Sequence, residues 1–225
     1  MYIIANLKQN KNIKEALEWL TSINWTIVNS KPNLRVILAP PAPFLYFFYD
    51  FFIEHFPTLL NFSVYLAGQN VSEYTDGSHT GEIGANQLKD MCKYCIVGHS
   101  ERRKEGESVR QTIAKVLRLK ENGITPVVCF SDVSEYRLME ESITLNDALF
   151  AYEPVNSIGT GNNAAVQEVL DIQKTLNLPK VIYGGSVDSK NVYDYINHGN
   201  GSIVGFLVGT SSLDSVKFTD LISKF

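Results

Sequence analysis

Cysteine is scarce in this sequence, and basic residues are not in excess. Three cysteines in 225 residues are a small and odd number, which argues against a disulfide framework and for a reducing cytoplasm. Lysine and arginine total 20 against 24 aspartates and glutamates, so the net charge is −4. A nucleic-acid-binding surface is usually basic, and we therefore expect a cytoplasmic protein without a nucleic-acid partner.

Long uninterrupted apolar segments are also missing. Residues Met1–Asn6 carry no cationic segment and form too short a run for an export signal. The most apolar stretch, Phe44–Phe56, contains Asp50, Glu54 and His55 and is too short to span a bilayer. Its phenylalanines recur at helical spacing and form one stripe. We expect this helix to dock against the core, in preference to a contact with a membrane surface or a partner. We therefore expect no membrane association.

The sequence does contain a repeating order of elements: a short apolar run, a polar turn and then a helical pattern. Eight apolar runs of strand length occur: Tyr2–Ala5, Leu34–Ala39, Val64–Ala67, Tyr94–Val97, Pro126–Phe130, Ala148–Tyr152, Val181–Tyr183 and Ile203–Val208. Runs that are almost entirely apolar are typical of parallel strands covered by helices. Eight such units predict one α/β domain, residues 1–225, that closes into a (β/α)8 barrel rather than an open doubly wound sheet.

Helical patterns separate these runs. They cover Asn12–Ser22, Phe44–Phe56, Asn86–Met91, Ser108–Asn122, Ala164–Leu176, Asp188–His198 and Asp214–Lys224. Asn12 with Glu15 three residues later predicts a capping box. Gly123 and Gly199 stand just past two helix ends, where a left-handed backbone is common. The segment Val133–Thr144 leaves room for only a short fifth helix.

Residues with reactive side chains follow the predicted strands. Asn6 and Lys8 come after the first, His99 after the fourth and Glu153 after the sixth. In a (β/α)8 barrel the loops at the strands' carboxyl ends carry the active site. Pro154 keeps the backbone of Glu153 extended, so this carboxylate is a candidate base. Taken singly, His99 and Lys8 could also be solvated surface residues.

A histidine at the start of a helical turn lies near the positive end of the peptide dipoles. This position disfavours the imidazolium, so we expect His99 to be neutral and to donate a hydrogen bond to a carbonyl oxygen. The ammonium of Lys8 could attract a phosphate and stabilise an enediolate oxygen. The candidate base Glu153 and the turn Gly159–Gly161 six residues later, whose backbone amides could hold an anion, indicate proton abstraction from a small phosphorylated molecule.

Three turns rich in small residues could bind an anion through their backbone amides. They are Gly159–Gly161, Gly184–Ser186 and Gly209–Ser211. Each is a weak signal alone, because glycine-rich turns are common. Together they are stronger, since phosphate sites recur on the loops after the seventh and eighth strands of such barrels.

Cys92 and Cys95, with His99 four residues further on, are a possible metal or redox site. A second cysteine pair is missing from the sequence, and Cys95 falls within a predicted strand, where a thiol usually packs as a small apolar group. We therefore expect no metal ion and no cofactor.

Several short motifs occur in an order and at spacings that together are highly specific. They are Ala5–Lys8, Gly68–Asn70, Thr80–Glu82, Val97–Arg103, Ala151–Val155, Ile158–Gly161, Tyr183–Val187 and Gly205–Gly209. Across nearly the whole chain these residues resemble the triosephosphate isomerase family. The resemblance implies a TIM barrel that interconverts dihydroxyacetone phosphate and D-glyceraldehyde 3-phosphate in glycolysis and gluconeogenesis, without metal or cofactor.

The resemblance also implies roles for individual residues. Glu153 would move the proton between carbons, and His99 would polarise the carbonyl and shuttle protons between oxygens. This pairing of a glutamate base with a neutral histidine is the established description of the family. Lys8 would balance negative charge, Asn6 would help to hold the substrate, and Glu101 would support Lys8.

The same resemblance assigns phosphate binding to backbone amides. The residues concerned are Gly159, Ser186, Gly209 and Thr210, and the loop Pro154–Gly161 would close over the ligand. The family is normally dimeric, so we expect a homodimer in which the loop Gln69–Glu82, with Thr80, inserts into the neighbouring subunit.

Some positions depart from the family pattern. Asn156 replaces a usual tryptophan, Ser157 a usual alanine and Thr210 a usual glycine, and Asp132 stands where a glutamate is usual. Our hypothesis is that Asn156 and Asp132 form a compensating hydrogen bond. Two alternatives remain open: a phosphate-binding barrel isomerase for a larger sugar phosphate, and a degenerate barrel that binds phosphorylated ligands without turnover.

Overall fold

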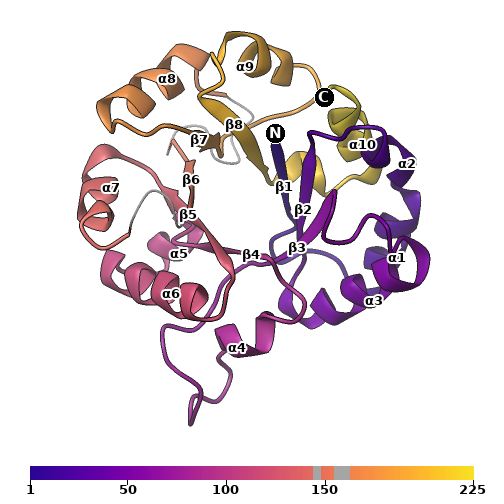
Figure 1. Cartoon of the computed structure of the whole chain (residues 1–225), viewed down its shortest axis with the longest axis horizontal. Helices are drawn as coiled ribbons and strands as arrows, with labels where there is room; N and C mark the ends of the chain where they lie inside the picture. Colours follow the sequence, from indigo (N-terminus) through magenta and orange to yellow (C-terminus); the bar gives the residue numbers. More distant parts are fainter. Residues whose placement is uncertain (144–147, 155–162) are drawn as a thin grey trace.

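Eight parallel strands form a closed barrel in the structure, a computed structural model that describes residues 1–143, 148–154 and 163–225. Each strand pairs with the next, and β8 pairs with β1 (Figure 1). The strands are β1 Tyr2–Asn6, β2 Arg35–Ala39, β3 Val64–Gly68, β4 Tyr94–Val97, β5 Thr125–Phe130, β6 Leu149–Tyr152, β7 Val181–Tyr183 and β8 Ile203–Val208. The predicted (β/α)8 barrel is confirmed, and every predicted run contains one of these strands or overlaps it closely.

Helices surround the barrel as an outer layer (Figure 1). They are α1 Ile13–Ser22, α2 Trp25–Asn29, α3 Leu45–His55, α4 Ala85–Leu88, α5 Ser100–Lys104, α6 Val109–Glu121, α7 Val133–Glu140, α8 Val166–Thr175, α9 Val192–His198 and α10 Ser215–Ser223, with 3-10 turns at Ala42–Phe44 and Thr210–Ser212. The short fifth helix predicted after β5 is α7. The sequence pattern did not predict α2, because five residues are too few to show helical periodicity.

The helix ends follow the predictions in part. The capping box at the start of α1 is present, with Asn12 and Glu15 as its members. Gly123 has φ 71°, the left-handed conformation expected there. The prediction for Gly199 was wrong, because its φ is −73°. The left-handed residues after α9 are Asn200 and Gly201, with φ 49° and 71°, so the chain reverses one residue later than expected.

Two apolar layers stabilise this architecture. The inner layer fills the barrel with side chains such as Ile4, Ile37 and Val127. The outer layer lies between strands and helices, and there the phenylalanine stripe of α3 is buried as predicted: Phe48 and Phe52 are fully inaccessible to solvent. Burying a phenylalanine side chain stabilises a fold by roughly 1.5–3 kcal/mol, so α3 anchors this side of the barrel. A helix with the length and apolar character needed to cross a membrane does not occur in the described part of the chain.

The cysteines are part of the apolar packing. Cys92, Cys95 and Cys129 are buried and form no disulfide. Burial raises the pKa of Cys92 to about 12 and also raises the pKa of Cys95 well above its usual range. Both groups therefore stay protonated near neutral pH and act as small apolar side chains, in line with the interpretation favoured from the sequence.

Candidate active site

A cavity of about 200 Å³ opens at the carboxyl ends of the strands. Ligand sites for drug-sized molecules occupy roughly 300–1,000 Å³, so this cavity suits a small ligand. Seven predicted site residues line it: Asn6, Lys8, His99, Glu153, Ser186, Gly209 and Thr210. Glu101 contacts Lys8 at its edge, whereas Gly159 lies outside the described residues. Loops after β1, β4, β6, β7 and β8 thus meet at one face of the barrel.

Glu153 lies directly after β6 and is almost inaccessible to solvent, with 1% of its surface exposed. Its backbone N–H donates to the carbonyl oxygen of Phe130 at 2.8 Å, which continues the β5–β6 pairing by one residue. Its carboxylate oxygen Oε2 accepts the backbone N–H of Ser100 at 2.9 Å, and Oε1 lies 3.0 Å from Nε2 of His99. Both carboxylate oxygens are therefore held by groups of the loop after β4.

His99 is the N-cap of α5, as its position before a helical turn predicted. Its Nδ1 accepts the backbone N–H of Glu101 at 3.2 Å, so this nitrogen carries no proton and Nε2–H points to Glu153. Burial lowers the pKa of His99, but the hydrogen bond and charge of Glu153 outweigh it, and the net direction is upward. Glu101 also raises the pKa of His99, and Lys8 lowers it.

Lys8 and Asn6 come from the end of β1. The backbone of Lys8 has φ 50°, a strained conformation for a residue other than glycine. Its N–H donates to Oδ1 of Asn6 at 3.1 Å, and its carbonyl oxygen accepts from Nε2 of Gln69 at 3.0 Å. Its Nζ lies 2.6 Å from Oε1 of Glu101. Burial raises the pKa of Glu101, but Lys8 outweighs that effect and the net direction is downward.

Gly184 and Gly185 are required by close contacts after β7. A Cβ on Gly184 would lie 2.8 Å from Cγ of Glu153 and 3.2 Å from the carbonyl oxygen of Tyr152. A Cβ on Gly185 would overlap the ring and hydroxyl of Tyr183. The sequence interpretation ascribed these glycines only to exposed amides. The structure adds that Gly184 leaves room for the buried carboxylate side chain of Glu153.

We predict that Gly184→Ala lowers kcat about 100-fold, because the added methyl displaces Glu153, and misplacement by about 1 Å has that order of effect. Steady-state kinetics together with thermal unfolding check this prediction. Gly123→Ala is the control: Gly123 has φ 71° and open space around it, so alanine there lowers stability but leaves kcat unchanged. An unaltered kcat in Gly184→Ala would refute this account of the contact.

Of the two residues in the hypothetical hydrogen bond between Asp132 and Asn156, the structure describes only Asp132. Asp132 caps α7, and its Oδ1 accepts from the backbone N–H of Glu135 at 3.0 Å and from the hydroxyl of Ser134 at 2.5 Å. These hydrogen bonds lower the pKa of Asp132. Asn156 and Ser157 lie outside the described residues.

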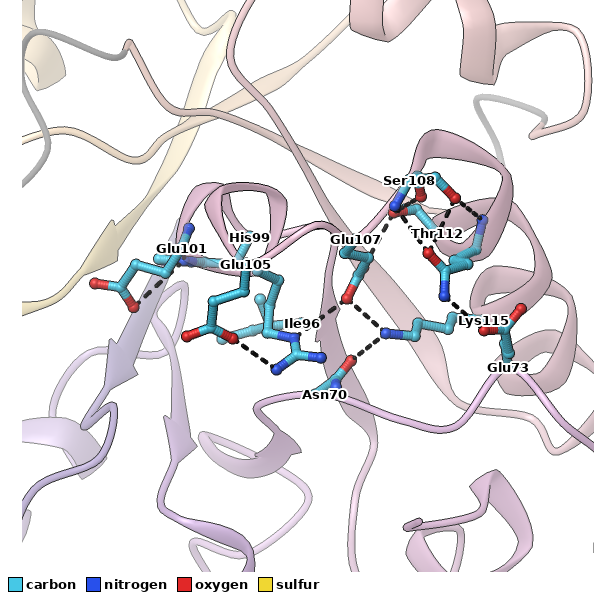
Figure 2. Close-up of polar contacts among 12 residues, drawn as sticks. Asn70, Glu73, Ile96, His99, Glu101, Glu105, Glu107, Ser108, Thr112 and Lys115 are labelled. Carbon is cyan, nitrogen blue, oxygen red and sulfur yellow. Dashed lines mark hydrogen bonds and ion pairs between the residues drawn. The ribbon is translucent and has the colours of Figure 1, made fainter. Parts of the chain in front are cut away.

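A polar network around the buried carboxylate of Glu107 was not predicted from the sequence (Figure 2). The carboxylate of Glu107 accepts from Nζ of Lys115 at 2.6 Å, from Nε of Arg102 at 3.3 Å and from Oγ1 of Thr112 at 3.2 Å. Lys115 also donates to Oδ1 of Asn70 at 2.9 Å. The network therefore joins the start of the loop 69–82 to α5, the helix that follows His99.

A signal for this network exists in the sequence. Lys115 falls on the apolar stripe of α6, between Thr112 and Leu119, and all three are buried. A lysine at such a position is rarely buried without a partner of opposite charge. The pattern predicts that a carboxylate is needed, but it does not identify Glu107.

The fold and the cavity define a (β/α)8-barrel isomerase. A buried carboxylate, an imidazole and an ammonium meet at the strands' carboxyl ends, where barrels of this kind bind phosphate through the loops after the last two strands.

Comparison with known proteins is in line with this class. The family model described as triosephosphate isomerase matches residues 1–225. Proteins named triosephosphate isomerase from Polynucleobacter asymbioticus, Mesomycoplasma hyorhinis and Neurospora crassa are 30%, 33% and 32% identical to this chain. The alignments cover 97%, 98% and 99% of this chain and 96%, 97% and 97% of the relatives. The chain belongs to the triosephosphate isomerase family, and the activity and fold expected from the resemblance are confirmed.

Proposed function

We propose that Glu153, His99, Lys8 and Asn6 carry out the interconversion of dihydroxyacetone phosphate and D-glyceraldehyde 3-phosphate, the reaction of the family. The observation that carries the proposal is the contact between Nε2 of His99 and the Glu153 carboxylate, 3.0 Å apart, in a cavity that Lys8 also lines. A base, a proton donor and a cation within one small cavity are the groups that enediolate chemistry needs.

In this mechanism Glu153 first exchanges its hydrogen bonds with Ser100 and His99 for a contact with the substrate. Its carboxylate removes a proton from one carbon and returns it to the adjacent carbon. The Nε2–H of His99 donates to the carbonyl oxygen and then moves protons between the two oxygens of the enediolate. Lys8 stabilises the negative charge that develops there, and Glu101 keeps its ammonium in place.

The phosphate group would bind to backbone amides beside the base. Ser186, Gly209 and Thr210 line the cavity, and Gly159, which is outside the described residues, would complete the set. Gly209 lies close to Lys8, since a Cβ there would be 3.2 Å from Cε of the lysine. The lysine side chain thus passes from the phosphate subsite toward the reacting atoms.

A coupled assay of triose phosphate isomerisation in both directions tests this function. We expect turnover of the triose phosphates without added metal or cofactor, and weak competition by pentose and hexose phosphates. A larger sugar phosphate that outcompetes the trioses would favour the alternative isomerase. Binding of phosphorylated ligands without turnover would favour the degenerate barrel.

A homodimer and a cytoplasmic location are part of the proposal. The connection between β3 and α4, which contains Gln69–Glu82, projects beyond the ring of helices (Figure 1). Its tip is exposed yet ordered by a stack of Tyr74 on His79, with ring centroids 4.1 Å apart. An ordered projecting loop is suited to insertion into a second subunit. Glycolysis and gluconeogenesis take place in the cytoplasm, where buried free thiols such as those of this chain persist.

We predict that replacing residues 74–81 by a short glycine linker gives a monomer. The intact chain should sediment at about twice its mass of 25.2 kDa, and the shortened chain near the monomer mass. Phe62→Ser is the control, because Phe62 is 75% exposed outside this loop. Sedimentation equilibrium makes the measurement, and a shortened chain that still dimerises would show that the interface lies elsewhere.

A further inference from the structure

Helix α9 contacts two loops of the cavity through side chains one helical turn apart. Asn191 is the residue before the first turn, and Tyr195 follows four positions later. Residues four apart lie on the same face of a helix. Family resemblance assigned no role to either side chain, and the proton-transfer steps above do not use them.

Asn191 holds the loop that follows β7. Its Nδ2 donates to the carbonyl oxygen of Ser186 at 3.0 Å, and its Oδ1 accepts the backbone N–H of Asp188 at 3.0 Å. One side chain therefore joins both ends of the three-residue segment 186–188, and it lines the cavity itself. This arrangement fixes the orientation of the two peptide groups that follow Ser186.

Tyr195 holds the end of the β6–α8 connection. Its ring is 1% exposed, and its hydroxyl donates to the carbonyl oxygen of Ala164 at 2.5 Å and accepts from Nδ2 of Asn163 at 3.0 Å. The N–H of Ala164 donates to the hydroxyl of Tyr183 at 2.7 Å. Two tyrosines thus bind both peptide groups of one residue.

The two tyrosines also connect the loops to each other. Their rings stack with centroids 4.7 Å apart, and the Tyr183 side chain lies over Gly185, where a Cβ would overlap it. Burial raises the pKa of Tyr195 far above its usual range, so its hydroxyl remains a donor at all physiological pH values. Displacing the Tyr195 hydroxyl would therefore disturb Ala164 and, through Tyr183, the backbone at Gly185.

We propose that Asn191 and Tyr195 are positioning residues for phosphate binding, through which α9 keeps the loop after β7 and the end of the β6–α8 connection in register. The inference rests on the proposed function, in which the amide of Ser186, in the loop after β7, binds the phosphate group. The side chains act through the loops and do not contact the reacting carbons. Their loss should therefore weaken binding more than it slows chemistry.

The test compares Asn191→Ala and Tyr195→Phe with the wild type. The readouts are KM and kcat for dihydroxyacetone phosphate and the inhibition constant of inorganic phosphate. Each variant loses a hydrogen bond that α9 donates to a loop. We expect KM and the phosphate inhibition constant to rise together about fivefold to tenfold, with kcat changed less than twofold. The double variant should show less than the product of the two effects, because Tyr183 couples the contacts of Tyr195 to the loop that Asn191 holds.

Tyr136→Phe is the matched control. Tyr136 lies on α7, is 1% exposed and packs against Phe130 of β5 and Phe150 of β6; it does not line the cavity. It should leave both constants unchanged. Should Asn191→Ala fail to fold, Asn191→Asp keeps the acceptor for Asp188 but loses the donor to Ser186, and the same rise is expected.

Three outcomes separate the inference from the function on which it rests. Unchanged KM and phosphate inhibition in the folded variants would overturn the positioning role of α9. A loss of kcat or of thermal stability alone, at constant KM, would also overturn it and indicate a merely structural role. If phosphate does not compete with substrate in the wild type, the anion site of the proposed function is itself wrong.

Discussion

Glu153→Gln should lower kcat about 10³- to 10⁴-fold, the largest loss of activity that we expect from one substitution. General base catalysis contributes roughly 10² to 10⁴ in rate, and Glu153 is the carboxylate that lines the cavity beside His99. The amide oxygen of glutamine can still accept the N–H of Ser100, so the local structure should persist. The side chain can no longer take a proton from carbon. The measurement is kcat in the coupled assay, with folding checked by thermal unfolding.

Glu141→Gln serves as the control for this substitution, since Glu141 is exposed after α7. It removes the same charge from the surface and should leave kcat unchanged. A Glu153→Gln variant as fast as the wild type would mean that another group is the base, and the proposed mechanism would have to be abandoned.

Glu107→Gln should destabilise the fold by about 3–5 kcal/mol, the usual cost of removing one partner of a buried ion pair. The side chains of Glu107 and Lys115 are 2% and 7% exposed, and Figure 2 shows the carboxylate between Lys115 and its other donors. Glutamine can still accept a hydrogen bond, but it leaves the ammonium of Lys115 buried without the negative charge that pairs with it. Urea unfolding at fixed protein concentration measures the difference, since association would otherwise shift the midpoint.

A double variant distinguishes charge imbalance from lost packing. Glu107→Leu with Lys115→Met removes both buried charges together, and such replacements are often neutral or stabilising. Arg102 would keep its ion pair with Glu105, 3.0 Å away. The double variant should therefore be more stable than Glu107→Gln. A single variant that loses less than about 1 kcal/mol would show that the pair contributes no more than a surface ion pair.

The same carboxylate gives the protein part of its acid sensitivity. Burial raises the pKa of Glu107, but Lys115, Arg102 and Thr112 together outweigh burial, and the net direction is downward. A lowered folded-state pKa means that this stabilisation is complete above the unfolded pKa of about 4.3 and is lost as pH falls through the folded value. Glu107→Gln should therefore flatten the acid side of the stability profile. An unchanged profile would contradict this assignment.

The barrel and most of the site follow from local patterns. Apolar runs of strand length predicted β1–β8, and parallel topology places their carboxyl ends together, so Lys8, His99 and Glu153 were predicted to meet before their contacts were known. The motifs of a well-defined family then supplied the roles of these residues. Such inferences need only the order of the elements along the chain and the face to which each contributes.

Contacts between distant side chains could not be predicted in this way. Lys115 and Asn70 are 45 positions apart, and Tyr195 and Ala164 are 31 apart, so no periodicity relates them. The role of Gly184 depends on where the Glu153 side chain lies, and that position depends in turn on Ser100 and His99. The left-handed residues after α9 were also misplaced by one position, because the turn uses Asn200 instead of Gly199.

Proton transfer in D2O tests the central claim most directly. Dihydroxyacetone phosphate is incubated with the wild type and with Glu153→Gln, and both triose phosphates are examined by NMR. The account predicts that the wild type introduces deuterium at the carbons adjacent to the carbonyl, because the proton held by Glu153 exchanges with solvent before its return, and that Glu153→Gln does so far more slowly. Wild-type products that remain free of carbon-bound deuterium after many turnovers would contradict it.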